Sequence, residues 1–202
     1  MLSLLPVAAQ AQEITIAALG DSLTQGFGLP QEDGFVPQLE AWLNDQGADA
    51  RVINAGVSGD TTAGGASRIA WTLTPDVDAI IVALGGNDLL RGIDPAASRA
   101  NMETILSTAS ASDLPVLVIG LPAPLNYGPD YKRDFDAIFP ELAAEYGALH
   151  IENFLEPITE GDQATNAGLY MQADGIHPNR DGVGLVVAHV GPSVQELIAM
   201  VE

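Results

Sequence analysis

Short apolar segments recur along this chain, and segments with helical character separate them. Five of the apolar segments are rich in β-branched residues and are predicted to be strands, at residues 14–19, 50–54, 79–84, 115–120 and 148–154. The third and fourth, AIIVAL and PVLVIG, are apolar almost throughout, as expected of strands covered on both faces. Strands that alternate with helices imply a parallel sheet with right-handed crossovers.

The intervening segments are predicted to be helices at residues 35–46, 66–73, 96–111, 131–146 and 182–200. Their ends carry the usual signals, such as Gly47 after the first helix and Asp94-Pro95 before the third. We therefore predict an α/β fold, a three-layer α/β/α sandwich around a five-stranded parallel sheet. No internal repeat or linker composition interrupts the chain, so residues 12–202 are expected to form a single domain.

The charge balance limits the possible partners. The chain has 7 basic and 27 acidic residues, a net charge of −20, which repels nucleic acid and anionic lipid surfaces. It has no cysteine, which excludes disulfides and thiolate chemistry. No stretch approaches the ~20 apolar residues of a membrane-spanning helix, so no stable membrane insertion is expected. A nucleotide-binding module is disfavoured, because the G-x-G-x-x-G order and a P-loop lysine are both missing.

The first residues, MLSLLPVAAQAQE, look like the end of a secretory signal peptide. A short apolar run leads to Ala9-Gln10-Ala11, which matches an A-x-A cleavage site. A frayed N-terminal tail is the alternative. We interpret residues 1–11 as the remnant of a signal peptide and expect a periplasmic or secreted protein.

Reactive and glycine-containing segments follow the predicted strands. Gly20-Asp21-Ser22 follows the first, residues 54–62 (NAGVSGDTT) follow the second, and Gly85-Gly86-Asn87-Asp88 follow the third. A fourth such segment, D-G-I-H-P-N at 174–179, lies near the C-terminus. Ligands of open parallel sheets bind beyond the carboxyl ends of the strands, so we expect these segments to form one site.

These four segments resemble the four blocks of the SGNH, or GDSL, hydrolase superfamily. Further stretches, among them LGGNDLLRG, NYG at 126–128 and DGIHPN, are similar to its periplasmic arylesterase group, which includes thioesterase I/lysophospholipase L1. The resemblance extends over residues 13–200 and implies a flavodoxin-like SGNH hydrolase fold. It also implies a serine esterase that cleaves aryl esters, short and medium acyl esters, lysophospholipids and acyl thioesters through an acyl-enzyme.

The residue types fit that chemistry. Ser22 is a weak nucleophile unless a base accepts its proton, and His177 is the candidate base. Asp174, three residues before His177, can fix the imidazole tautomer and stabilise the imidazolium. Taken singly, Ser22 could be a turn or N-cap residue, and Asp174 could cap the next turn. The G-x-S-x-G elbow of other hydrolases is absent.

Ester hydrolysis also needs hydrogen-bond donors for the developing oxyanion. The candidates are the backbone N–H groups of Ser22 and Gly59 and the side-chain amide of Asn87. Gly59 could instead be a simple turn glycine, and Asn87 could form an Asx turn. We interpret the acids that follow the strands as structural rather than as ligands of a metal, namely Asp21, Asp60 and Asp88. No metal or other cofactor is expected, and His150 and His189 are predicted to be packing or surface residues.

The acyl group is expected to bind along the loop after the fourth predicted strand. The resemblance implies that Leu121, Pro122 and Tyr127 line this pocket. At the position of Leu121 this chain departs from related enzymes, which often carry a basic or longer residue there. Phe154, Leu155 and residues 160–171 are candidates for the opposite wall. We expect a small-molecule ester or lipid-derived substrate and a monomeric enzyme. The alternative function is a carbohydrate O-acetyl esterase on the same fold, although only 5% of residues are aromatic and available for sugar stacking.

Overall fold

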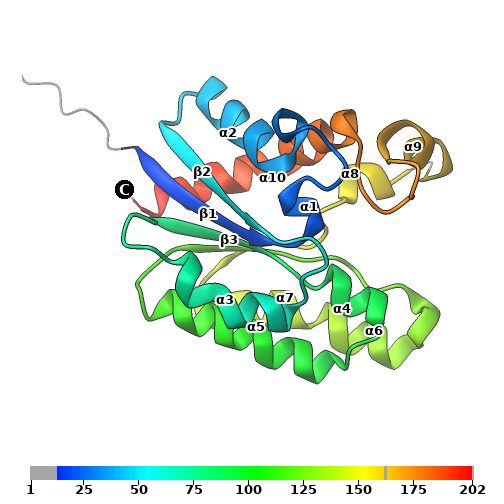
Figure 1. The fold of residues 1–202 in the computed structure, drawn as a ribbon. Helices are drawn as coiled ribbons and strands as arrows, with labels where there is room; N and C mark the ends of the chain where they lie inside the picture. Colours follow the sequence, from blue (N-terminus) through cyan, green and yellow to red (C-terminus); the bar gives the residue numbers. More distant parts are fainter. Residues whose placement is uncertain (1–12, 162, 202) are drawn as a thin grey trace, which may run out of the picture.

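The computed structural model describes residues 13–161 and 163–201, and its strands form one parallel sheet with helices on both faces (Figure 1). The predicted fold class is confirmed. The strands are β1 (Ile14–Gly20), β2 (Ala50–Gly56), β3 (Ala79–Ala83), β4 (Val116–Ile119) and β5 (Leu149–Ile151). The proposed signal-peptide remnant, residues 1–11, lies outside the described residues.

The sheet order is β2-β1-β3-β4-β5, which is the flavodoxin-like order. The strand order reverses at β1, because β1 pairs with β2 on one side and with β3 on the other. At its carboxyl end Gly20 pairs with Gly56 of β2 and with Ala83 of β3. The segments that follow these three strands therefore leave the sheet side by side, at the point where such folds bind ligands.

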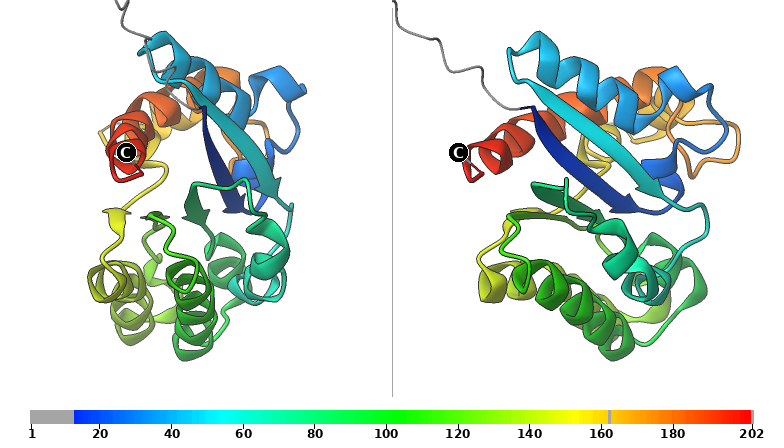
Figure 2. Two further views of the ribbon diagram at one scale, coloured as in Figure 1. Left: turned by 90° about the vertical axis from the view of Figure 1, so that its left-hand side faces the viewer. Right: turned by 60° about the vertical axis from the view of Figure 1, so that its left-hand side comes forward.

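The helices form the two outer layers (Figures 1 and 2). One layer contains α1 (Ser22–Gln25), α2 (Phe35–Asp45), α8 (Glu156–Thr159), α9 (Gln163–Tyr170) and α10 (Arg180–Ala199). The other contains α3 (Thr62–Thr72), α4 (Gly86–Arg91), α5 (Pro95–Ser110), α6 (Pro129–Asp136) and α7 (Ile138–Tyr146). Two short 3₁₀ helices, η1 (Gln31–Asp33) and η2 (Leu125–Tyr127), lie in the connections.

The sheet separates two hydrophobic cores. Alternate residues of a strand point to opposite faces, so Ile16 belongs to the core under α2 and α10. Its neighbours Ala17 and Leu19 belong to the core under α5 and α7. All residues of β1 are buried, which explains its continuous apolar sequence.

Several predicted helices differ from the observed ones in their bounds. The helix predicted at 131–146 is two helices, α6 and α7, because Pro140 has no N–H to donate to the carbonyl of Asp136. The helix predicted to begin at residue 66 begins at Thr62, where the Thr61 side chain accepts a hydrogen bond from Gly64 N. Helix α4, which begins inside the Gly85–Asp88 block, was not predicted.

Helix α10 corrects the expectation that no segment is long and apolar enough to resemble a membrane-spanning helix. Among the described residues, it is the one helix that is long and apolar enough to cross a membrane by length and composition. Half of it is buried inside the molecule, and its residues Val186, Val190 and Val194 pack in the core beside α2. Its apolar character is thus accounted for by the core it helps to form.

Candidate active site

The end of β1 presents a serine at the edge of the sheet. Asp21 caps α1, since its Oδ1 accepts a 3.0 Å hydrogen bond from Leu23 N. Ser22 is the first residue of this helix, so its backbone N–H has no acceptor within the helix. The nucleophile candidate therefore sits in a tight strand-to-helix turn that differs from the G-x-S-x-G elbow.

Ser22, His177 and Asp174 form a hydrogen-bonded chain. Ser22 Oγ lies 2.8 Å from His177 Nε2, although 155 residues separate them in sequence. His177 Nδ1 lies 2.7 Å from Asp174 Oδ2. A carboxylate can only accept, so Nδ1 carries the proton in the neutral ring and Nε2 is free to accept from the Ser22 hydroxyl. This is the arrangement that nucleophilic catalysis by serine needs.

Asp174 is held by three N–H groups. Besides the imidazole, its Oδ1 accepts from the backbone N–H of Ile176 at 2.9 Å and of His177 at 3.0 Å. The hydrogen bond from the His177 side chain, followed by these two, lowers the pKa of Asp174 to about 2. The carboxylate is therefore ionised throughout the pH range in which esterases work, and the same contacts fix the loop that carries the imidazole.

Gly59 and Asn87 are the two other residues predicted to supply oxyanion donors. Gly59 has a φ of 82°, in the left-handed region that favours glycine, and Arg91 Nη2 donates to its carbonyl oxygen at 2.7 Å. Asn87 Nδ2 donates to Asp21 Oδ2 at 3.3 Å. A primary amide has two N–H groups, so this bond leaves a second one for a ligand. Both residues line the same cavity as Ser22.

Asp21 is a buried acid beside the candidate oxyanion site. It is 3% exposed, and desolvation raises its pKa from 3.8 to about 6, against the lowering effect of the hydrogen bonds from Leu23 and Asn87. Its hydrogen bond to Asn87 agrees with the structural role predicted for it. The orientation of the Asn87 side-chain amide was not predicted. The hydrogen bond to Asp21 fixes it.

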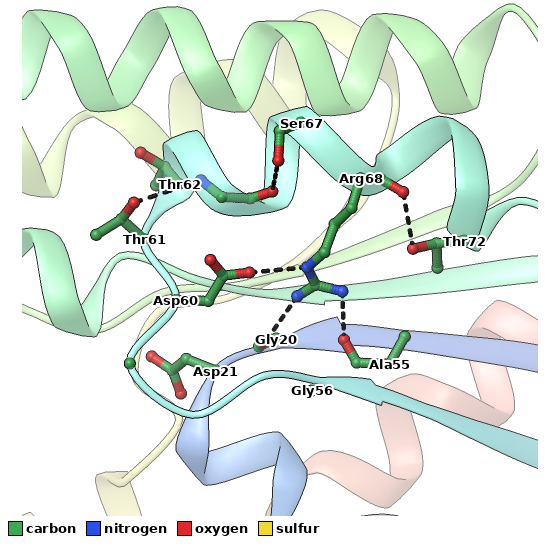
Figure 3. Close-up of polar contacts among 12 residues, drawn as sticks. Gly20, Asp21, Ala55, Gly56, Asp60, Thr61, Thr62, Ser67, Arg68 and Thr72 are labelled. Atoms are coloured by element: carbon green, nitrogen blue, oxygen red, sulfur yellow. Dashed lines mark hydrogen bonds and ion pairs between the residues drawn. The ribbon is translucent and has the colours of Figure 1, made fainter.

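The other two strand-end acids bind protein donors. Asp60 forms a 2.7 Å ion pair with Arg68 Nε, as Figure 3 shows. Arg68 also donates to Ala55 O at 2.6 Å and to Gly20 O at 2.9 Å, so it joins two strand ends to the loop of Gly59 (Figure 3). Asp88, fully buried, accepts from the backbone and hydroxyl of Thr62 and from Ser98 Oγ.

A cavity of about 450 Å³ opens around Ser22 and is lined mainly by apolar side chains. Leu121, Pro122 and Tyr127, the residues predicted to contact the acyl group, all line it. Leu155, a candidate for the opposite wall, also lines it. Phe154 does not, because it is buried in the core and packs edge-on against Phe35. Residues 160–171 contribute no described residue to the lining, which corrects that expectation.

Some residues that border or support the site were not predicted. Phe27 lines the cavity, and its ring lies 4.7 Å from that of His177. Gln172 Nε2 donates to Phe27 O at 2.8 Å and to Pro178 O at 2.9 Å, so it ties the two loops together. For Arg68 and Arg91 a signal did exist, since the chain has only 7 basic residues and two of them stand close to strand-end blocks. For Gln172 no sequence signal existed.

A flavodoxin-like sheet with a Ser–His–Asp chain at its switch point defines a serine hydrolase of the SGNH class. The sequence matches the GDSL-like lipase/acylhydrolase family over residues 18–185. The chain belongs to this family, and its assignment as a carboxylic ester hydrolase is confirmed.

Within this family, the chain is similar over most of its length to two named proteins and one solved structure. The chain is 37% identical over 198 residues to esterase TesA of Pseudomonas aeruginosa, covering 98% of this chain and 96% of that protein. It is 34% identical over 186 residues to thioesterase 1/protease 1/lysophospholipase L1 of Escherichia coli, covering 91% and 85%. The crystal structure of AlinE4, an SGNH-hydrolase family esterase, superposes with a TM-score of 0.75 at 40% identity, covering 93% and 98%. The carbohydrate O-acetyl esterase alternative is not favoured by these names.

Proposed function

We propose that Ser22, His177 and Asp174 are the catalytic residues of this esterase. The observation that carries the proposal is the pair of short contacts, 2.8 Å from Ser22 Oγ to His177 Nε2 and 2.7 Å from His177 Nδ1 to Asp174 Oδ2. Segments from opposite ends of the chain make these contacts, and their chemistry is that of a nucleophile, a base and an orienting acid.

The reaction proceeds through an acyl-enzyme. Ser22 Oγ attacks the carbonyl carbon of the ester while its proton passes to His177 Nε2, and Asp174 stabilises the resulting imidazolium. The bond from carbon to the leaving oxygen then breaks, and that oxygen takes the proton from Nε2. Water attacks the acyl carbon in the second half, gives a proton to Nε2, and releases the acid as Ser22 Oγ is reprotonated.

The oxyanion of each tetrahedral intermediate accepts hydrogen bonds from Ser22 N–H, Gly59 N–H and the Asn87 amide. One such donor contributes roughly 10²–10³ in rate in other acyl-transfer enzymes. The support here is positional, since Gly59 and Asn87 line the same cavity as Ser22 and Asn87 also contacts Asp21, the residue before Ser22. The acyl chain lies along Leu121, Pro122 and Tyr127.

The substrates we propose are aryl esters, short and medium acyl esters and lysophospholipids. The apolar cavity suits an acyl chain, and one relative is named a thioesterase and lysophospholipase. We expect acyl-CoA thioesters to be cleaved in vitro but less readily, because a net charge of −20 opposes so anionic a ligand.

A p-nitrophenyl ester series of increasing acyl length, with wild type and Ser22→Ala, tests this function. We expect the substitution to lower kcat by several orders of magnitude for every ester in the series. A variant that kept most of the wild-type rate would show that Ser22 is not the nucleophile.

Export is the second part of the proposal. Its support is the A-x-A sequence before Gln12, and the experiment is N-terminal sequencing of the protein from the cell envelope. We expect the mature chain to begin at Gln12. A protein that retained Met1 and stayed in the cytoplasm would contradict export.

The oligomeric state is a separate prediction. We expect the protein to elute as a monomer in size-exclusion chromatography.

A further inference from the structure

We propose that Phe27 and Ile176 form the wall against which the leaving group of the ester binds, and that this wall selects aryl and other large apolar alcohols. The inference rests on the proposed function, because it uses the role of His177. It concerns the part of the cavity beside His177.

The mechanism determines where the leaving group must lie. The tetrahedral carbon carries four groups: Ser22 Oγ, the oxyanion, the acyl chain and the leaving oxygen. His177 Nε2 must reach the leaving oxygen to protonate it. Gly59 and Asn87 border the oxyanion, and the acyl chain follows Leu121, so the leaving group has to pass the imidazole.

Two large apolar side chains border the cavity at that place. Phe27 lies against the His177 ring, with a centroid distance of 4.7 Å and an interplanar angle of 39°. Ile176 directly precedes His177 and lines the same cavity. Both side chains are 47% exposed, so neither is used to fill the core. A ligand that covered them would gain the free energy of burying apolar surface.

The wall is held in place by hydrogen bonds from both sides. Phe27 N donates to Ser22 O at 3.1 Å, and Phe27 O accepts from Gln172 Nε2 at 2.8 Å. The same Gln172 amide nitrogen donates to Pro178 O, and Gln172 N donates to His177 O at 2.7 Å. The aromatic ring and the imidazole are therefore parts of one braced unit, and a bound aryl group need not order a loose loop.

Charge points to the same class of leaving group. Among the described residues that line the cavity there is no lysine or arginine, and one acid, Asp21, is present. Arg91 stands nearby but donates to Gly59 O. The clustered phosphate charges of a CoA leaving group find no cation here, whereas a phenol or naphthol finds an aromatic face.

The test is a series of butyrate esters that differ in the leaving group alone: phenyl, 2-naphthyl and trifluoroethyl. Each rate is expressed as the ratio of wild type to Phe27→Ala, so that the intrinsic reactivity of the ester cancels. We expect kcat/KM to fall about 10- to 100-fold for the two aryl esters and less than about threefold for the trifluoroethyl ester. Phe27→Tyr should restore kcat/KM for the aryl esters. Trp71 is an aromatic residue on α3 that is 87% exposed and lies outside the cavity, so Trp71→Ala should leave kcat/KM unchanged for all three esters.

A second measurement separates binding of the leaving group from a structural effect on His177. Butyryl-enzyme is the same whatever alcohol has left, so its hydrolysis rate should be equal in wild type and Phe27→Ala. In acyl transfer, where an alcohol replaces water and gives its proton to Nε2, benzyl alcohol should lose its advantage over methanol in the variant.

Equal losses for all three esters, or a slower deacylation in Phe27→Ala, would overturn the proposal and leave the esterase function intact. Failure of the proposed catalytic role of Ser22 looks different, since Ser22→Ala would then retain activity on all three esters. The two failures are therefore distinguishable.

Discussion

Arg68 on α3 donates a 2.9 Å hydrogen bond to the carbonyl oxygen of Gly20, which stands two residues before Ser22. The same guanidinium binds the Asp60 carboxylate, next to Gly59, and the carbonyl of Ala55 at the end of β2. One side chain thus joins the turn that carries the proposed nucleophile to the loop that carries a proposed oxyanion donor. Arg68 is a positioning residue, because it acts on substrate only through these neighbours.

We predict that Arg68→Lys lowers kcat with little change in KM. Lysine keeps the charge, but its ammonium cannot reproduce the planar fork that binds a carboxylate and two carbonyls at once. A shift of the Gly59 loop weakens the oxyanion contacts, which matter most in the transition state. We expect kcat for p-nitrophenyl butyrate to fall by roughly 10- to 100-fold, within the range of removing one oxyanion donor.

Arg99→Lys is the matched control. Arg99 on α5 pairs with Glu141 at the surface and does not line the cavity around Ser22, and such a pair contributes ~1 kcal/mol or less. This variant should keep the wild-type kcat. If Arg68→Lys raised KM and left kcat unchanged, the guanidinium would not act through the oxyanion loop.

The sheet could be predicted because each strand carries its own signal. Residues 79–84 are apolar almost throughout and β-branched, and a run of that kind is buried on both faces whatever surrounds it. Helix bounds were less predictable. Pro140 lies inside an amphipathic pattern, and its missing N–H decided against a continuous helix. Gly64 and Gly65 concealed the first turn of α3, which the Thr61 cap begins.

The candidate site residues could be predicted because they stand in four glycine-containing segments, three of which follow parallel strands. The supporting residues could not. Gln172 matters because its amide reaches both Phe27 and Pro178, and a contact between such distant segments leaves no local pattern. The half-exposed ring of Phe27 likewise becomes a candidate site residue only because the structure places it beside the imidazole of His177.

We predict that Asp21→Asn removes a pH dependence of stability. The unfolded carboxyl has a pKa near 3.8, whereas burial raises it to about 6 in the folded protein. Below about pH 4 the group is neutral in both states. Between these values the folded protein binds the extra proton, so the stabilisation is lost as pH rises through about 6. Asparagine is neutral at every pH, and it can still accept from Leu23 N.

Urea unfolding at intervals from pH 4 to pH 8 measures this effect. The free energy of unfolding of the variant, relative to wild type, should rise by up to about 3 kcal/mol across the window and then level off. A difference that stayed constant with pH would mean that Asp21 titrates at its ordinary pKa in the folded protein.

We predict that Ser98→Ala destabilises the fold through Asp88. Ser98 Oγ donates to the fully buried Asp88 carboxylate at 2.8 Å, and alanine leaves that charge one donor short. The loss of a hydrogen bond to a buried charge costs about 1.5–3 kcal/mol. Ser67→Ala is the control, since its hydroxyl makes an exposed bond to Gly64 O and should cost less than about 0.5 kcal/mol. Chemical denaturation of the two variants side by side gives the comparison, and equal losses would refute the buried-charge explanation.

Asp174→Asn should leave the structure of the loop intact and remove most of the activity. An amide oxygen can replace the carboxylate as acceptor for the N–H groups of Ile176 and His177, so the turn survives. The amide nitrogen is a donor, however, and if it faces His177 Nδ1 it moves the ring proton to Nε2. A protonated Nε2 cannot accept from Ser22.

We therefore expect kcat to fall by roughly 10³- to 10⁴-fold, as in other triads with a wrong tautomer, while KM changes little. Nitrogen NMR of the imidazole should find the proton on Nδ1 in wild type and on Nε2 in the variant. The pKa of Asp174 is about 2, so this carboxylate stays ionised above about pH 3. We therefore expect titration of Asp174 to change neither the Nδ1 tautomer nor the reaction rate of wild type above that pH. A variant with the wild-type rate, or with the proton still on Nδ1, would show that Asp174 does not select the tautomer.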